Sequence, residues 1–174
     1  FLMKKTPQDF DLATSALPDE VEKLFHKTIP VGKQFGVILV IDDEEQIEVT
    51  TFRRDGGYRD GRHPSEISFT DDKEDALRRD FTVNGLFYDP FRKQVLDYVG
   101  GREDLQKKII RAIGDPAQRF DEDKLRLLRA VRFAANLNFT IETQTWQELL
   151  RLAPQIHQVS PERIRDELIK IFTR

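Results

Sequence analysis

The sequence predicts a mixed α/β region over residues 1–114, followed by an all-helical region over residues 115–174. In the first region, short segments alternate apolar with polar residues and are bounded by polar or glycine-containing turns, which is typical of strands. In the second, apolar residues recur at helical spacing over longer segments. No apolar run approaches the ~20 residues that a membrane helix needs. We therefore expect a cytoplasmic protein with no membrane partner.

The first region begins with a predicted strand over residues 10–13. Pro18 and the two acids after it predict a helix through about residue 27, because proline and acids favour the first helical turn. Residues 37–41 and 46–52 predict two strands around an acidic turn. The polar stretch 53–65 contains three glycines and is expected to be a mobile loop.

The later elements follow the same logic. Asp71 or Asp72 is expected to cap a helix through about residue 79, and residues 86–88 and 94–98 predict a second hairpin. A short helix is predicted over residues 101–107. Three longer helices are predicted after it, over residues 121–136, 143–152 and 161–172.

Charge is distributed unevenly along the chain. Residues 1–100 hold 14 Lys and Arg against 20 Asp and Glu, whereas residues 101–174 hold 14 against 11. An acidic first part suits metal binding, and a basic second part suits phosphate contact. The chain has no Cys and only three His, so any metal would be held by oxygen ligands, which favours magnesium, calcium or manganese.

Three carboxylates in the first region are candidate catalytic residues. Asp9 and Asp11 share one face of the predicted strand, where two like charges need a compensating cation, and oxygen ligands select magnesium. An isolated pair of this kind is more often a solvated strand end. Glu48, however, is expected to point to one face of its strand while its neighbours Ile47 and Val49 point to the other. A lone acid on a central strand is costly unless it is used. Three such carboxylates on two adjacent strands favour two-metal phosphoryl transfer.

A second cluster combines paired arginines with hydrogen-bond acceptors. Arg78 and Arg79 offer guanidinium forks for phosphate, while Asp80 and Asn84 offer groups for a ribose hydroxyl. The same residues also fit a simpler interpretation, in which cations complete a helix dipole and Asn84 lies in a turn.

A third cluster lies on the predicted helix 121–136. Four charged residues recur there every three positions: Asp123, Arg126, Arg129 and Arg132. The same helix is expected to carry an apolar stripe made of Leu125, Leu128 and Val131. These charges could form ordinary surface pairs worth a few tenths of a kcal/mol. Alternatively, a carboxylate beside a guanidinium matches the amine and ring nitrogen that cytosine and adenine share, whereas guanine and uracil invert that pattern.

These clusters together resemble the class II tRNA nucleotidyltransferases and bacterial poly(A) polymerases. The resemblance rests on five motifs in the family's order: Asp9-Phe10-Asp11, Glu48–Arg53, Asp60–Pro64, Arg78–Asn84 and Glu122-Asp123-x-x-Arg126. It implies a polymerase β-like nucleotidyltransferase head, with a mixed sheet and flanking helices, followed by a helical neck. It also implies CMP and AMP transfer from CTP and ATP to the 3′ end of tRNA.

The resemblance assigns roles to individual residues. Asp9 and Asp11 would bind Mg²⁺, and Arg78 or Arg79 would contact the triphosphate while Asp80 contacts the ribose. In the third cluster, Asp123 with Arg126 would read the base, and Arg129 and Arg132 would hold the nucleotide. Asp60 and Arg62 would belong to a flexible loop needed chiefly for adding the terminal A.

Some features leave alternatives open. The family's glycine-rich phosphate-binding segment is expected just before Asp9 and is not seen there, and the body and tail domains are expected after Arg174. We therefore expect a fragment of a longer protein. Within the family, partial CC or A addition and poly(A) addition use the same motifs. The alternative to an enzyme is a module that binds RNA or a nucleotide without catalysing a reaction.

Overall fold

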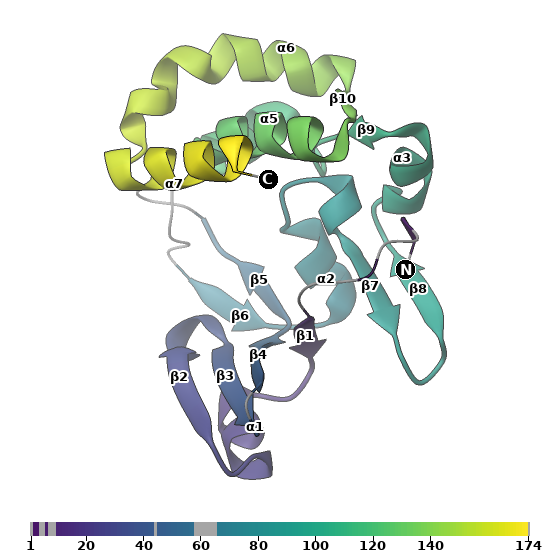
Figure 1. Cartoon of the computed structure of the whole chain (residues 1–174), viewed down its shortest axis with the longest axis vertical. Helices are drawn as coiled ribbons and strands as arrows, with labels where there is room; N and C mark the ends of the chain where they lie inside the picture. The colour runs from purple at the N-terminus through teal and green to yellow at the C-terminus, as the bar shows by residue number, and fades with distance from the viewer. Residues whose placement is uncertain (1, 4–5, 7–9, 44, 58–65, 174) are drawn as a thin grey trace. The chain divides into compact units, whose positions relative to one another are not determined.

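The computed structural model describes residues 2–3, 6, 10–43, 45–57 and 66–173. The chain divides into two compact units (Figure 1). The first comprises Phe1–Arg54 and Ile67–Asp75, and the second comprises Asp55–Glu66 and Ala76–Arg174. The mixed head and the helical region predicted from the sequence are both present. The second unit also contains a strand hairpin and a short helix from the predicted α/β region.

A four-stranded mixed sheet forms the centre of the first unit, in the order β1-β4-β3-β2. Its strands are β1 (Asp11–Thr14), β2 (Thr28–Gly32), β3 (Val37–Asp42) and β4 (Glu45–Thr51). The outer strand β1 runs parallel to β4, while β3 is antiparallel to both β4 and β2. The predictions for β1, β3 and β4 are confirmed. Strand β2 was not predicted, because it contains Pro30, which strands tolerate mainly at sheet edges.

One face of this sheet is covered by helix α1 (Pro18–Leu24), which packs against β3 and β4 (Figure 1). Val21 of α1 joins Ile38, Val40 and Val49 in a buried cluster. The period of two along each strand places the intervening residues on the opposite face. Helix α1 begins at Pro18 as predicted but ends at Leu24, because Phe25 adopts an extended conformation.

A short ribbon and a helix complete this part of the chain. Strands β5 (Arg53–Asp55) and β6 (Ile67–Phe69) pair, so the start of the predicted loop 53–65 is a strand. Helix α2 (Asp72–Leu77) follows. The Asp71 carboxylate accepts a hydrogen bond from the Glu74 N–H at 2.9 Å, which confirms the predicted cap.

The second unit begins with the β7 (Leu86–Asp89) and β8 (Gln94–Asp97) hairpin, as predicted. Helices α3 (Gly101–Lys107), α6 (Thr143–Leu152) and α7 (Pro161–Phe172) have the predicted bounds. Two-residue strands β9 (Ile109–Ile110) and β10 (Thr140–Ile141) pair in parallel. Figure 1 shows α5 (Leu125–Leu137) beside α7, and α4 (Pro116–Glu122) packs against α6.

The predicted single helix over residues 121–136 is wrong. It is replaced by α4 and α5, which are separated at Asp123. Asp123 has extended backbone angles, φ −152° and ψ 109°, and its carboxylate accepts a hydrogen bond from the Leu125 N–H at 3.0 Å. Aspartate bonded to the backbone in this way favours a helix start over a helix interior. The helical spacing of the later residues concealed this break.

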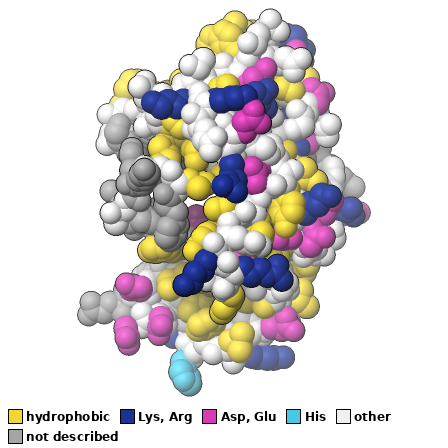
Figure 2. Space-filling model, turned by 90° about the vertical axis from the view of Figure 1, so that its right-hand side faces the viewer, with side chains coloured by type: hydrophobic (Ala, Val, Ile, Leu, Met, Phe, Trp, Pro, Cys, Tyr) yellow, Lys and Arg dark blue, Asp and Glu magenta, His cyan; other side chains and the backbone are white. Residues whose placement is uncertain are grey.

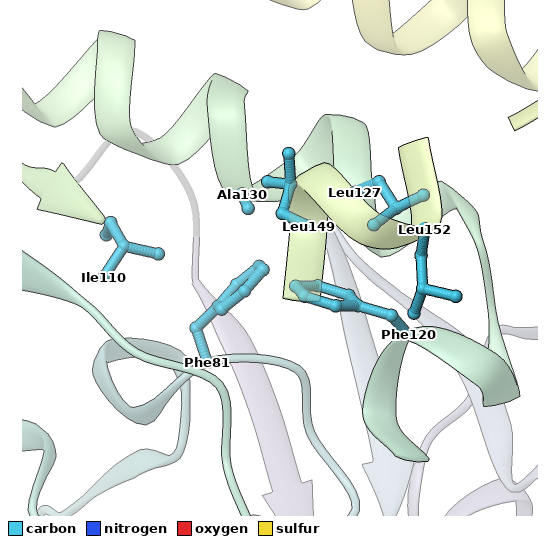
Figure 3. Packing of buried hydrophobic residues seen from close by; sticks show 7 residues of the cluster. All are labelled: Phe81, Ile110, Phe120, Leu127, Ala130, Leu149 and Leu152. Atoms are coloured by element: carbon cyan, nitrogen blue, oxygen red, sulfur yellow. The ribbon is translucent and has the colours of Figure 1, made fainter. Parts of the chain in front are cut away.

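Seven buried residues form the core of the second unit, and Figure 3 shows all of them: Phe81, Ile110, Phe120, Leu127, Ala130, Leu149 and Leu152. The rings of Phe81 and Phe120 point toward one another beneath Leu149 (Figure 3). The apolar stripe predicted on α5 is therefore partly wrong. Leu125 is buried, but Val131 is 37% exposed, and the face that enters the core carries Leu127 and Ala130.

Candidate functional site

Two of the three candidate carboxylates in the first unit lie side by side. Asp11 on β1 and Glu48 on β4 are direct partners in the parallel register. Neighbouring strands are about 4.8 Å apart, so the two side chains leave adjacent points on the same face of the sheet. That face is opposite the one packed against α1, because Val49 next to Glu48 belongs to the buried cluster.

Both carboxylates are exposed, and neither forms an ion pair with another residue that the structure describes. Glu48 does lie on a central strand, as predicted, but its side chain is exposed, so the expected cost of an acid at this position does not arise from burial. Asp9 lies outside the described residues. Among the residues that the structure describes, no group of three metal-ligating side chains is found. Asp11 and Glu48 thus supply two hard oxygen ligands whose mutual repulsion a divalent cation would relieve.

The Asp80 carboxylate in the second unit is 7% exposed and accepts hydrogen bonds from three neighbours. Its Oδ1 accepts from the Phe81 N–H at 2.9 Å and from Asn84 Nδ2 at 3.0 Å. Its Oδ2 accepts a hydrogen bond from Arg129 Nε at 2.7 Å, and Arg129 Nη2 lies 2.6 Å from the same oxygen in an ion pair. Hydrogen bonds to described residues thus use three of the about four lone-pair sites of this carboxylate and fix its orientation.

The paired arginines before Asp80 are also engaged. Arg78 Nη1 lies 3.6 Å from the Asp55 carboxylate. Arg79 donates to the Asn84 carbonyl at 3.0 Å, and its guanidinium carbon stacks 4.4 Å from the centre of the Phe87 ring. Stacking and ion pairing hold both side chains in place. The charged and polar side chains of the predicted cluster Arg78–Asn84 are therefore held in place by contacts with each other and with neighbouring residues.

Asp123 and Arg126 are not paired with each other in the described structure. The Asp123 carboxylate pairs with Arg163 of α7, at 3.2 Å from Nη1 to Oδ1 and 2.7 Å from Nη2 to Oδ2. Arg126 pairs instead with Glu122, at 2.6 Å from Nη1 to Oε2. The two residues flank the α4–α5 junction, so the idea that both project from one helix is wrong.

Arg126 also connects the junction to the chain around residue 78. Its Nη1 donates to the Arg119 carbonyl at 2.8 Å, and its Nη2 lies 3.5 Å from the Arg78 carbonyl. Arg119 donates to the carbonyls of Leu77 and Arg78, both at 3.1 Å. Two guanidinium groups thus tie the start of the Arg78–Asn84 segment to the α4–α5 junction, so the second and third sequence clusters are in direct contact.

The remaining arginines of α5 pair with an acid on α7. Arg132 Nε donates to Glu167 Oε2 at 2.6 Å, and Arg129 Nη1 lies 4.0 Å from Glu167 Oε1. Glu167 is 3% exposed, so these arginines supply the compensating charge and hydrogen bonds that a buried carboxylate needs. Arg129 therefore bridges Asp80 and Glu167, and α7 is fixed to α5 by buried charge as well as by packing.

The sequence reasoning missed three members of this network: Arg119, Arg163 and Glu167. Arg163 and Glu167 are four residues apart, so they lie on one face of α7. That spacing was a usable signal for a helix face that pairs with charges elsewhere. Nothing in the sequence identified those charges as Asp123 and Arg132. The expected loop residues Asp60 and Arg62 lie outside the described residues.

Local hydrogen bonds perturb two further carboxylates in the second unit. Burial alone would raise the pKa of Asp97, but backbone N–H groups of four residues outweigh it and lower that pKa: Arg102, Val99, Gly101 and Gly100. Burial likewise opposes ionisation of Glu142, but donors from Thr145 and Gln144 and the charge of Arg111 lower its pKa. Both carboxylates fix helix starts, Asp97 before α3 and Glu142 before α6.

Comparison with known proteins identifies the class. Residues 1–111 match the family model described as "Poly A polymerase head domain", and residues 138–174 match "Probable RNA and SrmB- binding site of polymerase A". The first match covers more than half of the chain. The chain therefore belongs to the poly A polymerase head-domain family. This confirms the resemblance inferred from the five motifs.

The particular relatives are CCA-adding enzymes. The "CCA-adding enzyme" of Bacillus subtilis (strain 168) is 45% identical over 171 residues, which is 98% of this chain and 43% of the relative. The crystal structure of the Bacillus stearothermophilus CCA-adding enzyme in complex with CTP matches with a TM-score of 0.89 and 38% identity. That match covers 98% of this chain and 41% of the other. The chain thus spans less than half the length of these relatives.

A further solved structure is a tRNA nucleotidyltransferase complexed with a primer tRNA and an incoming ATP analog. It matches with a TM-score of 0.78 and 25% identity, over 99% of this chain and 52% of that one.

Among the described helices of the present chain, none combines the length and the apolar content of a membrane span.

Proposed function

We propose that the protein containing this chain transfers CMP and AMP from CTP and ATP to the 3′ end of tRNA. The observation that carries the proposal is the pair of exposed carboxylates, Asp11 and Glu48, in register on two parallel strands. A folded protein gains little from placing two like charges together without a cation. The similarity to CCA-adding enzymes supports this reaction class and these substrates.

The donor set fits a divalent cation. We propose Mg²⁺ as the cofactor, with Asp9 and Asp11 as its protein ligands and Glu48 as the third carboxylate of the centre. Bound Mg²⁺ would activate the terminal tRNA hydroxyl and neutralise charge on the triphosphate. Asp11 and Glu48 contribute a fixed negative patch, because the strand register sets their separation. Strand β1 has only four residues, so Asp11 depends on β4 for its position.

The arginine network of the second unit is proposed to bind and select the nucleotide. Arg78 or Arg79 would contact the triphosphate, and Asp80 and Asn84 would contact the ribose. Arg129 and Arg132 would help to hold the nucleotide, and they also bond to Asp80 and Glu167. Asp123 would accept from the exocyclic amine of cytosine or adenine, and Arg126 would donate to the adjacent ring nitrogen. A uracil or guanine would place a carbonyl against Asp123 and an N–H against Arg126.

The test uses the complete gene product and tRNA transcripts that end before CC, after the first C, and after CC. Labelled CTP or ATP is supplied with MgCl₂ or with excess EDTA. The proposal expects two CMP additions and then one AMP addition, and none with EDTA. Incorporation of AMP alone, repeated and independent of the tRNA end, would indicate poly(A) addition. Partial addition would indicate a CC- or A-adding enzyme, and no incorporation with retained RNA binding would indicate a binding module.

A further inference from the structure

The Asp123 carboxylate is held by a side chain from another helix. Both guanidinium Nη groups of Arg163 on α7 donate to it, one to each carboxylate oxygen. The side chains are 16% exposed for Asp123 and 22% for Arg163, so the pair is largely sheltered from water. Such a two-point contact fixes the plane of a carboxylate, whereas a single bond leaves it free to rotate.

Counting acceptor sites shows what this arrangement leaves available. Asp123 Oδ1 accepts from the Leu125 N–H at 3.0 Å and from Arg163 Nη1. Oδ2 accepts from Arg163 Nη2 at 2.7 Å. A carboxylate has about four lone-pair sites, two on each oxygen. Among the described residues, three of the four are therefore used, and the remaining acceptor is on Oδ2.

Arg163 is itself anchored. Glu167, one turn later on α7, bonds to the buried Arg132 of α5, and α5 packs along α7. The α5–α7 contact thus fixes the part of α7 that carries Arg163, and the two-point contact with Asp123 then links that carboxylate to the fixed helix. Without the fork, Asp123 would keep only the Leu125 bond, and either oxygen could turn toward a bound base.

We propose that Arg163 is a positioning residue that sets base selectivity by orienting Asp123. It leaves Oδ2 as the one acceptor presented to the exocyclic amine of cytosine or adenine. A carbonyl of uracil or guanine in that place would face an acceptor that cannot turn away, which is a repulsive element against the wrong base. This inference rests on the proposed function, in which Asp123 reads the base.

The experiment compares three variants of the complete gene product: Arg163→Ala, Arg163→Lys and the matched control Arg165→Ala. Arg165 lies on the same helix, is exposed and pairs only with its neighbour Asp166 among the described residues. For each, kcat and KM are measured with CTP and with UTP on tRNA that lacks CCA, and thermal unfolding is recorded. The Lys variant keeps the positive charge but replaces the two-point guanidinium contact with a single ammonium group.

For Arg163→Ala we expect the CTP-over-UTP ratio of kcat/KM to fall by about 5- to 150-fold, the range that one bidentate contact supplies. The loss should lie mainly in a higher KM for CTP. Arg163→Lys should give an intermediate ratio, and Arg165→Ala should match the unaltered protein. If Arg163→Ala does not fold, the Lys variant decides by the same ratio.

An equal loss of kcat/KM for CTP and UTP, with the ratio unchanged, would show that Arg163 only stabilises the helix junction and would overturn the inference. Equilibrium binding of CTP and UTP without tRNA separates this from failure of the proposed function. If the unaltered protein transfers nothing but prefers CTP, and Arg163→Ala loses that preference, the inference stands while the proposed function fails. Equal binding of CTP and UTP by the unaltered protein would overturn the inference.

Discussion

The two units treat their charged side chains in opposite ways. In the first unit, Asp11 and Glu48 are exposed and adjacent, and neither forms an ion pair with a described residue. In the second, Asp80, Glu167 and Arg132 are buried, and each is hydrogen-bonded to a charged partner. Figure 2 shows Lys and Arg side chains interspersed with Asp and Glu on one side of the molecule.

This contrast teaches what each group can be used for. Two exposed carboxylates that form no ion pair with a described residue can accept a metal without breaking any ion pair within the described part of the chain. A buried network of arginines and acids is fixed in advance, and preorganised groups are what discrimination between similar bases requires. We therefore expect substitutions in the first unit to remove chemistry at little cost in stability. Substitutions in the second should change stability and selectivity together.

The largest effect is expected at Asp11. Replacing it with Asn should lower the rates of CMP and AMP transfer together by at least about 100-fold, as when one preorganised electrostatic group is removed from an active site. Thermal unfolding should be unchanged, because Asp11 is exposed. The matched control is Glu45→Gln, on the neighbouring strand β4 and also exposed. Near-normal incorporation by Asp11→Asn in Mg²⁺ would exclude the proposed metal role.

The second effect is on stability and concerns the buried acid of the other unit. Glu167→Ala leaves Arg132 with an uncompensated charge, and breaking a buried pair in this way costs about 3–5 kcal/mol of unfolding free energy. Denaturant unfolding measures it, with Glu162→Ala at the exposed start of α7 as the control. A loss no larger than that of the control would show that the buried network contributes nothing to the fold.

A smaller effect is expected from acid. The pKa values of Asp97 and Glu142 are lowered in the folded state. Each carboxylate therefore stabilises the fold above its unfolded pKa of about 4, and that contribution is lost as the pH falls through the lower folded value. Unfolding free energy should be flat near neutral pH and decrease below about pH 4. The decrease should be shallower in Glu142→Gln. An identical pH profile would show that the cap is not linked to protonation.

The smallest effect is expected at Arg165. Its pair with Asp166 is exposed, with 69% and 56% of the side chains accessible. Exposed pairs contribute little, so Arg165→Ala should change the unfolding free energy by no more than about 0.5 kcal/mol. Thermal unfolding at low and high salt tests it. A larger loss would mean that this side of α7 contributes more to stability than its exposure indicates.

Local patterns predicted much of the fold. The bounds of α3, α6 and α7 follow from a glycine start, helical spacing and a Ser-Pro start, all of which act within a few residues. The sequence analysis also placed Asp11 and Glu48 on adjacent strands, and the register of β1 with β4 confirms this, although strand alternation fixes only which residues of one strand share a face. Strand β2 was missed, since its pairing with β3 outweighs the disfavour of Pro30.

The partners of the site charges could not be predicted in the same way. Asp123 pairs with Arg163 at a separation of 40 residues, and Arg129 pairs with Asp80 at a separation of 49. No periodicity links such positions, because only the packing of α5 against α7 and of the Asp80 turn brings them together. Helical spacing instead suggested that Asp123 and Arg126 are neighbours on one helix, which the break at Asp123 contradicts.

The division of labour between the two units is tested most directly by nucleotide binding without transfer. Equilibrium dissociation constants for CTP and UTP would be measured with Glu48→Gln and with Asp123→Ala of the complete gene product. Glu48→Gln should lose transfer but keep a preference for CTP, because the selecting groups lie in the other unit. Asp123→Ala should bind CTP and UTP about equally. Loss of the CTP preference in Glu48→Gln, or its persistence in Asp123→Ala, would contradict the separation of chemistry from base selection.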